Sequence, residues 1–295
     1  MGAKSGKKAQ SAMEYLMTYG WAILIIAVVL AALYSLGLFN SAAWGPRASS
    51  GSCKVFRTTA VTTLEGVCNN VIPRSVAQFS GASSVVKVPY SSSLSLTSQA
   101  TMSGWYYVNS VSPTLIGTVV AQQGASTFSS FGFGPLASGD NKIEVLFTTT
   151  GSGYGGWTPG AQPALAANQW YFIVATYSSA TSTLSLYING AQYTTTSVAT
   201  GQLVASTNPV YIGDYGGYYT NGQIADVQVY NTSLDANQVQ ALYMEGIGGV
   251  PVNLQYIVGW WPLNGDFNDY SGNGNAGTPT SMAFTSSWTS GYTNP

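Results

Sequence analysis

The residues with the most evident capacity for chemistry are four oxygen-bearing side chains near the C-terminus. Asp266, Asp269, Asn273 and Asn275 fall within ten positions of one another. Calcium prefers carboxylate and carbonyl oxygens supplied by flexible loops, and Asp226 could approach such a loop from an upstream strand. Asp, Asn and Gly also build turns by themselves. A calcium site and a set of simple turns are therefore both open readings.

Catalytic residues in known arrangements are absent from the sequence. The chain has no histidine, which excludes a Ser-His-Asp triad and a Cys-His pair. Glycosidases use a pair of carboxylates, but no Glu-x-Asp-x-Glu run is present. The string GSGYGGW lacks the Lys-Ser/Thr that a phosphate-binding loop requires. We expect no catalytic residues and a protein that is not an enzyme.

Aromatic residues in glycine-rich segments are candidates for sugar binding. These are Trp157, Tyr215, Tyr218 and Tyr219, which we place in loops rather than strands. Loops on a rigid scaffold often carry binding residues. The same tyrosines could instead pack over loop backbone or face neighbouring subunits. Asn231-Thr232-Ser233 is a glycosylation sequon, although its place in the fold could also explain it.

Composition excludes some partners and is of a kind common on secreted, surface-exposed proteins. Only 6% of residues are charged, against roughly 25% in ordinary soluble domains. No basic stripe is present, so nucleic acid is not expected as a partner. Cys53 and Cys68 are the two cysteines. In an exported chain they would form one disulfide, the alternative being two buried thiols.

The N-terminal region carries a long apolar run. Residues Trp21 to Phe39 contain no charge and no proline, and such a run is long enough for a membrane-spanning helix. Lys4, Lys7 and Lys8 precede it and should keep the N-terminus cytoplasmic. A cleaved secretory signal ending near Ala43 and a permanent anchor are two alternatives.

A third interpretation rests on the residues around the last lysine. The string from Gln10 to Leu16 (QSAMEYL), following Lys7-Lys8-Ala9, resembles the class III signal peptides of archaeal type IV pilins. The resemblance implies cleavage between Ala9 and Gln10 by a prepilin peptidase, with a leader over 1–9 and an apolar helix over 10–45. It also implies that Glu14 pairs with the N-terminal amine of another pilin subunit during assembly. The precursor would be membrane-inserted and the mature protein an extracellular surface filament.

Strand signals dominate from about residue 71. Short runs rich in Val, Ile, Thr, Tyr and Phe alternate with Gly, Ser, Asn and Pro clusters, the pattern of a β-sandwich. Asn189-Gly190 between two alternating runs predicts a hairpin with a type I′ turn. Trp105 and Trp170 are expected in the core. Asp235 and Gln238 predict a capping box for one helix that Gly246 ends, with Val239, Leu242 and Tyr243 on its buried face.

These strands, in this order, resemble concanavalin A-like jelly-roll domains of the LamG type. The motifs that carry the resemblance are Phe79-Ser80-Gly81, Met102-Ser103-Gly104-Trp105, Gln169-Trp170-Tyr171 and the run GQIADVQVYN from Gly222 to Asn231. It covers about residues 75–285 and implies an all-β sandwich. Family members often hold calcium near the Asp269 loop, but Ala225 replaces the first of their paired aspartates.

The order of two motifs departs from that family. Gly259-Trp260-Trp261-Pro262-Leu263 and the run DYSGNGNAG from Asp269 to Gly277 come last here, whereas the family has them first. We therefore predict a circularly permuted domain over 75–295, in which segment 254–295 completes the sheets, preceded by a linker over 46–74. The leading function is a pilin-like filament subunit that displays a lectin-like adhesion domain for glycan or cell-surface ligands. The alternative is a membrane-anchored lectin-like protein that does not polymerise.

Overall fold

The computed structural model describes two compact units, which divide at Ala48 and Ser49. It describes the backbone of residues 6–35, 54–58, 61–65, 71–111, 117–123, 130–135, 140–196 and 199–295. Side chains are described for the same ranges, except that the first covers 17–31, the two over 54–65 carry none and the range beginning at 140 ends at 193. Cys53 and Cys68 lie outside the described residues, so the disulfide stays a prediction.

The first unit contains helix α1 (Gly6–Ser35). The helix runs without a break through Ala9, Gln10 and Glu14, whose side chains are not described. Every described side chain from Met17 to Ala31 is exposed. Within the described residues, no helix has the length and apolarity needed to cross a membrane. The predicted span from Trp21 to Phe39 extends past the described residues and stays a prediction.

Two strands occupy the segment predicted as a linker. They are β1 (Lys54–Thr58) and β2 (Val61–Glu65), paired antiparallel with Lys54 opposite Glu65. This hairpin was not predicted because Thr59-Ala60, between the strands, lacks the Gly, Asn or Pro that marks most turns.

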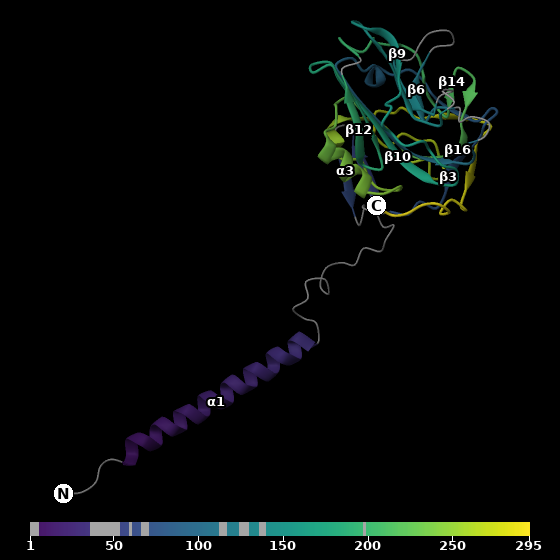
Figure 1. Ribbon diagram of the computed structural model, residues 1–295. Coiled ribbons are helices and arrows are strands. Elements are labelled where there is room, and N and C mark those ends of the chain that lie inside the picture. The colour runs from purple at the N-terminus through teal and green to yellow at the C-terminus, as the bar shows by residue number, and fades with distance from the viewer. Residues whose placement is uncertain are drawn as a thin grey trace. The chain divides into compact units, whose positions relative to one another are not determined.

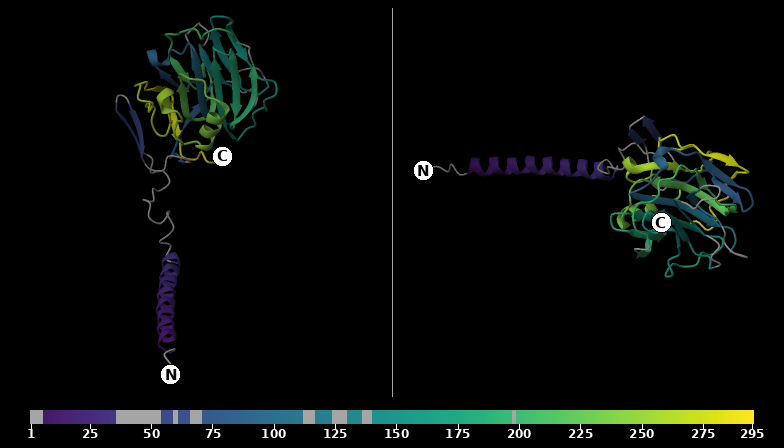
Figure 2. Two further views of the ribbon diagram at one scale, coloured as in Figure 1. Left: turned by 90° about the vertical axis from the view of Figure 1, so that its left-hand side faces the viewer. Right: turned by 90° about the horizontal axis from the view of Figure 1, so that it is seen from above.

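The rest of the second unit is a β-sandwich, as predicted (Figures 1 and 2). Among the described residues, one sheet has eight strands and the other has seven. The eight-stranded sheet runs in the order β12 (Ala191–Thr196), β11 (Thr183–Ile188), β10 (Trp170–Ser178), β5 (Gln99–Val108), β16 (Asn221–Tyr230), β3 (Val76–Ser80) and β19 (Ala283–Thr285), with β17 (Ile257–Trp261) also paired to β16. The seven-stranded sheet runs β18 (Thr278–Thr280), β4 (Val85–Val88), β13 (Val210–Ile212), β6 (Val120–Gln122), β7 (Phe131–Gly134), β8 (Glu144–Thr149) and β9 (Gly153–Trp157).

The C-terminal segment completes both sheets. The first half of β16 pairs with β3 and its second half pairs with β17, on the same edge. Strand β18 pairs with β4, and β19 pairs with β3. Segments from opposite ends of the domain therefore lie side by side, as the blue and yellow strands of Figure 2 show. Strands of segment 254–295 thus occupy positions in both sheets, and the description of this segment as a permutation stays an interpretation.

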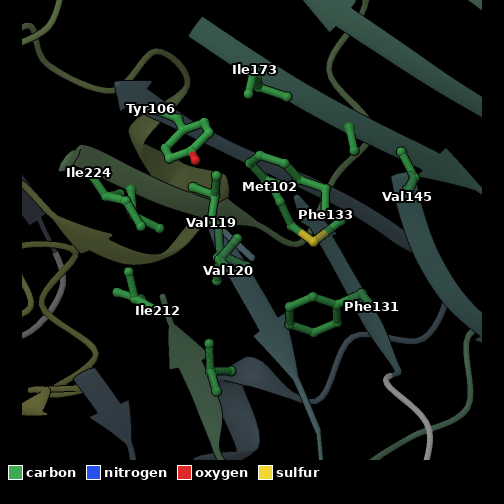
Figure 3. Packing of buried hydrophobic residues seen from close by; sticks show 14 of the residues in the cluster. Met102, Tyr106, Val119, Val120, Phe131, Phe133, Val145, Ile173, Ile212 and Ile224 are labelled. Carbon is green, nitrogen blue, oxygen red and sulfur yellow. The ribbon is translucent and has the colours of Figure 1, made fainter. Parts of the chain in front are cut away.

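One apolar core fills the space between the sheets. Met102, Tyr106, Ile173 and Ile224 from the eight-stranded sheet face Phe131, Phe133, Val145 and Ile212 from the other (Figure 3). A second cluster covers the outer face of the eight-stranded sheet beneath α3 (Ala236–Met244). Since both faces of β5 and β10 are covered, these strands are buried almost throughout and lack alternation.

Local signals placed the hairpin and the helix correctly. Asn189 and Gly190 have φ of 51° and 76°, as a type I′ turn between β11 and β12 requires. Asp235 and Gln238 form the reciprocal capping box. Gly246 follows the helix with φ of 77°, and Val239 and Leu242 are buried while Tyr243 is half-buried. Trp105 and Trp170 lie in the second cluster, as expected of core residues.

Candidate functional site

The predicted sugar-binding aromatics lie in strands, not in loops as expected. Trp157 ends β9, while Tyr215 lies in β14 (Asp214–Tyr215) and Tyr218 and Tyr219 form β15 (Tyr218–Tyr219). The reason is the Gly216-Gly217 pair, whose φ values of 60° and 93° close a tight hairpin that brings Tyr215 opposite Tyr218. Asp214 stabilises this turn, because its Oδ1 accepts the Gly217 N–H at 2.9 Å.

Strand alternation separates two of the four aromatics from the others. A side chain at Gly155 would meet Phe147 in the core, so Gly155 and Trp157 face inward. Trp157 accordingly packs against the core between the sheets. Tyr219 pairs with Asp214 on the opposite face of the hairpin from Tyr215 and Tyr218.

The structure adds Tyr154, which was not among the residues predicted from the sequence. By alternation in β9, Tyr154 points away from the core, and its hydroxyl lies 3.3 Å from that of Tyr215. Tyr154 and Tyr218 are exposed and Tyr215 is half-buried. We call Tyr154, Tyr215 and Tyr218 the tyrosine surface. The alternation of GYGGW in β9 was the signal that could have identified it.

A hydrogen bond positions this surface, and burial and nearby charges change the pKa values of its polar groups. The Gln123 side chain donates to the backbone oxygen of Asp214 at 3.4 Å, tying the hairpin to the end of β6. Burial, the hydrogen bond with Tyr215 and the nearby Glu144 raise the pKa of the Tyr154 hydroxyl. Burial and Asp140 also raise the pKa of Glu144. The surface therefore combines aromatic rings, neutral hydroxyls and a carboxylate.

The predicted calcium ligands from Asp266 to Asn275 form a hydrogen-bonded loop against β17. Asp269 Oδ1 accepts the N–H groups of Trp260 and Ser271 at 3.0 and 2.8 Å. Its Oδ2 accepts the Ser271 hydroxyl and the Asn275 N–H at 2.9 and 2.8 Å. Both oxygens of this carboxylate are thus engaged by donors from the protein itself.

The remaining loop residues are also occupied by protein partners. Asp266 accepts the Asn268 N–H and the Tyr270 hydroxyl. The amide groups of Asn273 and Asn275 donate to backbone oxygens of β17, including that of Val258. Within the described part of the chain, no group of three or more His, Cys, Asp and Glu side chains could hold a metal.

Asp226 lies in a buried network that includes Trp260 of β17. It occupies a bulge of β16 with φ of 50°. Its two carboxylate oxygens accept the Trp260 indole N–H and the Gln228 amide, each at 2.8 Å. Burial, reinforced by Glu245, raises the pKa of Asp226 to about 7, although both hydrogen bonds oppose that shift. The five predicted ligands do not fit a calcium cage in this geometry, and calcium binding remains untested.

The sequence of the β domain matches one known family. A family model described as the Concanavalin A-like lectin/glucanases superfamily matches residues 80–240. No curated protein matches the sequence.

Solved structures include proteins with a similar fold. One, from Bacteroides ovatus, was solved as a candidate carbohydrate binding protein; it is 17% identical, with a TM-score of 0.55 over 76% of this chain and 63% of its own. A heptameric pentraxin from Limulus polyphemus is 14% identical, with a TM-score of 0.49 over 72% of this chain and 94% of its own. The chain thus spans less than two thirds of the Bacteroides structure, and its likeness to that structure shows the fold alone.

Proposed function

This chain belongs to the concanavalin A-like lectin/glucanases superfamily, and we propose that its β domain binds glycans as the displayed head of a pilin-like surface filament. The observation that carries the binding role is the tyrosine surface, with exposed rings beside the Glu144 carboxylate. The Bacteroides protein of the same fold was solved as a candidate carbohydrate binding protein, which agrees with this ligand class.

Sugars suit the chemistry of these residues. Tyrosine rings present flat apolar surface with little conformational entropy to lose, and their hydroxyls remain available for hydrogen bonds. The hairpin turn and the Gln123 contact hold Tyr215 and Tyr218 in place before any ligand arrives. Such preorganisation lowers the cost of binding.

Substitution of two tyrosines tests the binding role. The full chain in detergent micelles would be screened on a glycan array, and the affinity of the best ligand measured by calorimetry. We expect Tyr215→Ala with Tyr218→Ala to weaken that ligand at least about tenfold, because exposed aromatic anchors dominate such interfaces. Met244→Ala is the matched control, since Met244 is 48% exposed and Tyr218 49%. Equal affinities in both variants would contradict the assignment.

The filament role is supported by α1. Its described side chains, from Met17 to Ala31, are apolar on nearly every side, and Trp21 and Ile25 are 65% and 57% exposed. A helix that is apolar all round needs a lipid or protein environment to cover it. A pilin would provide both environments in succession: the membrane surrounds the helix of the precursor, and neighbouring helices surround it in the filament.

The mature N-terminus separates the filament from the alternatives. N-terminal sequencing should find Gln10 first after prepilin peptidase cleavage. An intact N-terminus would favour the membrane-anchored lectin-like protein that does not polymerise, and a start near Ala43 would contradict both. An unpaired carboxylate in the membrane is costly, so Glu14 should favour pairing with another subunit. Glu14→Ala removes that carboxylate and should abolish incorporation into filaments, while membrane insertion persists. Thr18→Ala, one turn further along α1, is the control.

We propose binding without catalysis. A reducing-sugar assay on the best array ligand should show no hydrolysis by the intact chain. Release of sugar above the background of a buffer blank would show that the β domain is a glycosidase and not a lectin-like binding head.

A further inference from the structure

A groove of about 730 Å³ lies on the sandwich away from the tyrosine surface. One wall is formed by η1 (Ser92–Leu94) and the residues that follow it to Gln99. The other is formed by η2 (Leu254–Tyr256) and the start of β17. The volume lies within the range of about 300–1,000 Å³ that small-molecule sites occupy.

The groove is lined by neutral polar groups over an apolar floor. None of its described lining residues is charged. Ser95, Thr97, Asn231 and Gln255 line it, and none of their side chains forms a hydrogen bond within the described part of the chain. Ile257 and Val258 contribute apolar surface. Unused hydroxyl and amide groups of this kind can donate and accept hydrogen bonds in many directions.

Hydrogen bonds made by several lining residues hold both walls in place. Asn275 donates to the Ser93 hydroxyl at 3.0 Å, and Asn273 donates to the backbone oxygen of Val258 at 3.2 Å. The Gln99 side-chain oxygen accepts the Thr232 hydroxyl at 3.1 Å. The loop from Asp266 to Asn275 therefore supports this groove. A site whose walls are fixed in advance binds at a lower entropic cost.

We propose that this groove is a second saccharide site, which takes an uncharged sugar. A sugar offers many hydroxyls to the free Ser, Thr, Asn and Gln groups, and its C–H face can cover Ile257 and Val258. An ion or a phosphorylated ligand would find no opposite charge among the described lining residues. This inference goes beyond the tyrosine surface, since the two sites share no residue.

The sugar could reach the groove from two sources. Asn231 is exposed, lines the groove and begins the sequon, so a glycan attached to it would start at the groove wall. A free oligosaccharide could occupy the same place on an unmodified chain. The chemistry of recognition is the same in both cases.

The first experiment tests the free sugar. The full chain, produced in a bacterial host that adds no N-linked glycan, would be titrated in micelles with maltose, lactose, cellobiose and chitobiose. We expect at least one to bind, and Thr97→Val with Gln255→Met to weaken it about tenfold or more, since both substitutions keep side-chain volume but remove hydrogen-bonding groups. Met244→Ala, a substitution outside both sites, should leave this affinity unchanged, and Tyr215→Ala with Tyr218→Ala is titrated beside it to identify any binding at the tyrosine surface. Thermal unfolding of each variant checks that the fold persists.

The second experiment tests the attached glycan. On a chain glycosylated at Asn231, the amides of residues 92–99 and 254–258 should exchange hydrogen more slowly than in Asn231→Gln. The proposal is overturned if exchange is unchanged and no sugar binds in a manner that depends on Thr97 and Gln255. Binding that depends only on the tyrosines would then leave the proposed function standing. Binding that depends only on the groove would instead contradict the assignment of the tyrosine surface.

Discussion

The outer faces of the two sheets carry the same kind of side chain in opposite settings. On the eight-stranded sheet, Trp105, Trp170 and Phe172 lie beneath α3 and the C-terminal segment, which adds Trp288 and Tyr292. We call these five residues the aromatic cluster. The tyrosine surface, formed by β9 of the seven-stranded sheet and by the separate two-stranded sheet of β14 and β15, lies open beside Glu144. The difference teaches that covering, rather than residue type, decides whether aromatics on a sheet stabilise the fold or are available for a ligand.

Ring contacts show how completely the aromatic cluster is assembled. Trp105 packs against Phe172 and Tyr292 with ring centroids 5.2 and 5.4 Å apart. The Trp170 indole donates to the Trp288 backbone oxygen at 2.9 Å, and the Trp288 indole donates to that of Pro73 at 3.1 Å. The cluster thus joins the first and last segments of the sandwich.

Removal of the C-terminal cover should have the largest effect. A chain ending at Gly249 loses β17, β18 and β19 together with Trp288, so that parts of both sheets and the aromatic cluster are exposed. We expect no cooperative thermal transition of the β domain, measured by circular dichroism on the chain in micelles. A chain ending at Tyr292 should unfold like the wild type. Cooperative unfolding of the shorter chain would show that segment 254–295 does not complete the sandwich.

A matched pair of single substitutions makes the comparison quantitative. Trp105→Ala should lower the free energy of unfolding by about 3–5 kcal/mol, because it opens a cavity in a buried cluster. Tyr218→Ala should change it by less than about 0.5 kcal/mol, as for most exposed positions. Denaturant titration of both variants provides the measurement. Similar losses of unfolding free energy in the two variants would mean that the tyrosine surface stabilises the fold, which would contradict its assignment as a binding site.

Predictions from the sequence were most successful where the signal was local. Asn189-Gly190 and the Asp235–Gln238 box each specify a conformation within four residues, and both were confirmed. The role of Asp269 could not be predicted, because its partners are donors such as the Trp260 N–H, nine positions away. The partial burial of Trp157 also depended on the register of β9 against β8. Composition shows which side chains are available, but only the pairing of strands shows which of them face each other.

The pH dependence of stability should also differ between the two faces. Asp226 lies beside Trp260 of the second cluster, on the covered face of the eight-stranded sheet. Its pKa is raised to about 7, against about 3.9 in an unfolded chain. Between about pH 4 and pH 7 the folded state therefore binds more protons than the unfolded state, so the free energy of unfolding falls as pH rises. The loss is on the order of a few kcal/mol, because a tenfold difference in proton affinity between the two states corresponds to about 1.4 kcal/mol.

Two isosteric variants separate the contributions of Asp226 and Glu144 to the decline in the free energy of unfolding with pH. Asp226→Asn should flatten most of the decline in the free energy of unfolding between pH 4 and 7, measured by denaturant titration at each pH. Glu144→Gln beside the tyrosine surface should remove a smaller part of this decline, because Glu144 is half-buried and solvent screens its charge. A steep slope that survives Asp226→Asn would show that another group is responsible.

The smallest expected effect concerns the loop from Asp266 to Asn275. This loop contacts the second cluster through the hydrogen bond from the Trp260 N–H to Asp269. Each oxygen of the Asp269 carboxylate already accepts two hydrogen bonds, so a calcium ion would have to displace donors from the protein. We therefore expect millimolar calcium to raise the Tm by less than about 1 °C, since ligand stabilisation grows only with the ratio of ligand to Kd. Magnesium at the same concentration controls for ionic strength. A calcium-specific rise of several degrees, lost in Asp269→Asn, would restore the calcium site and make this loop a ligand-dependent support for the covered face.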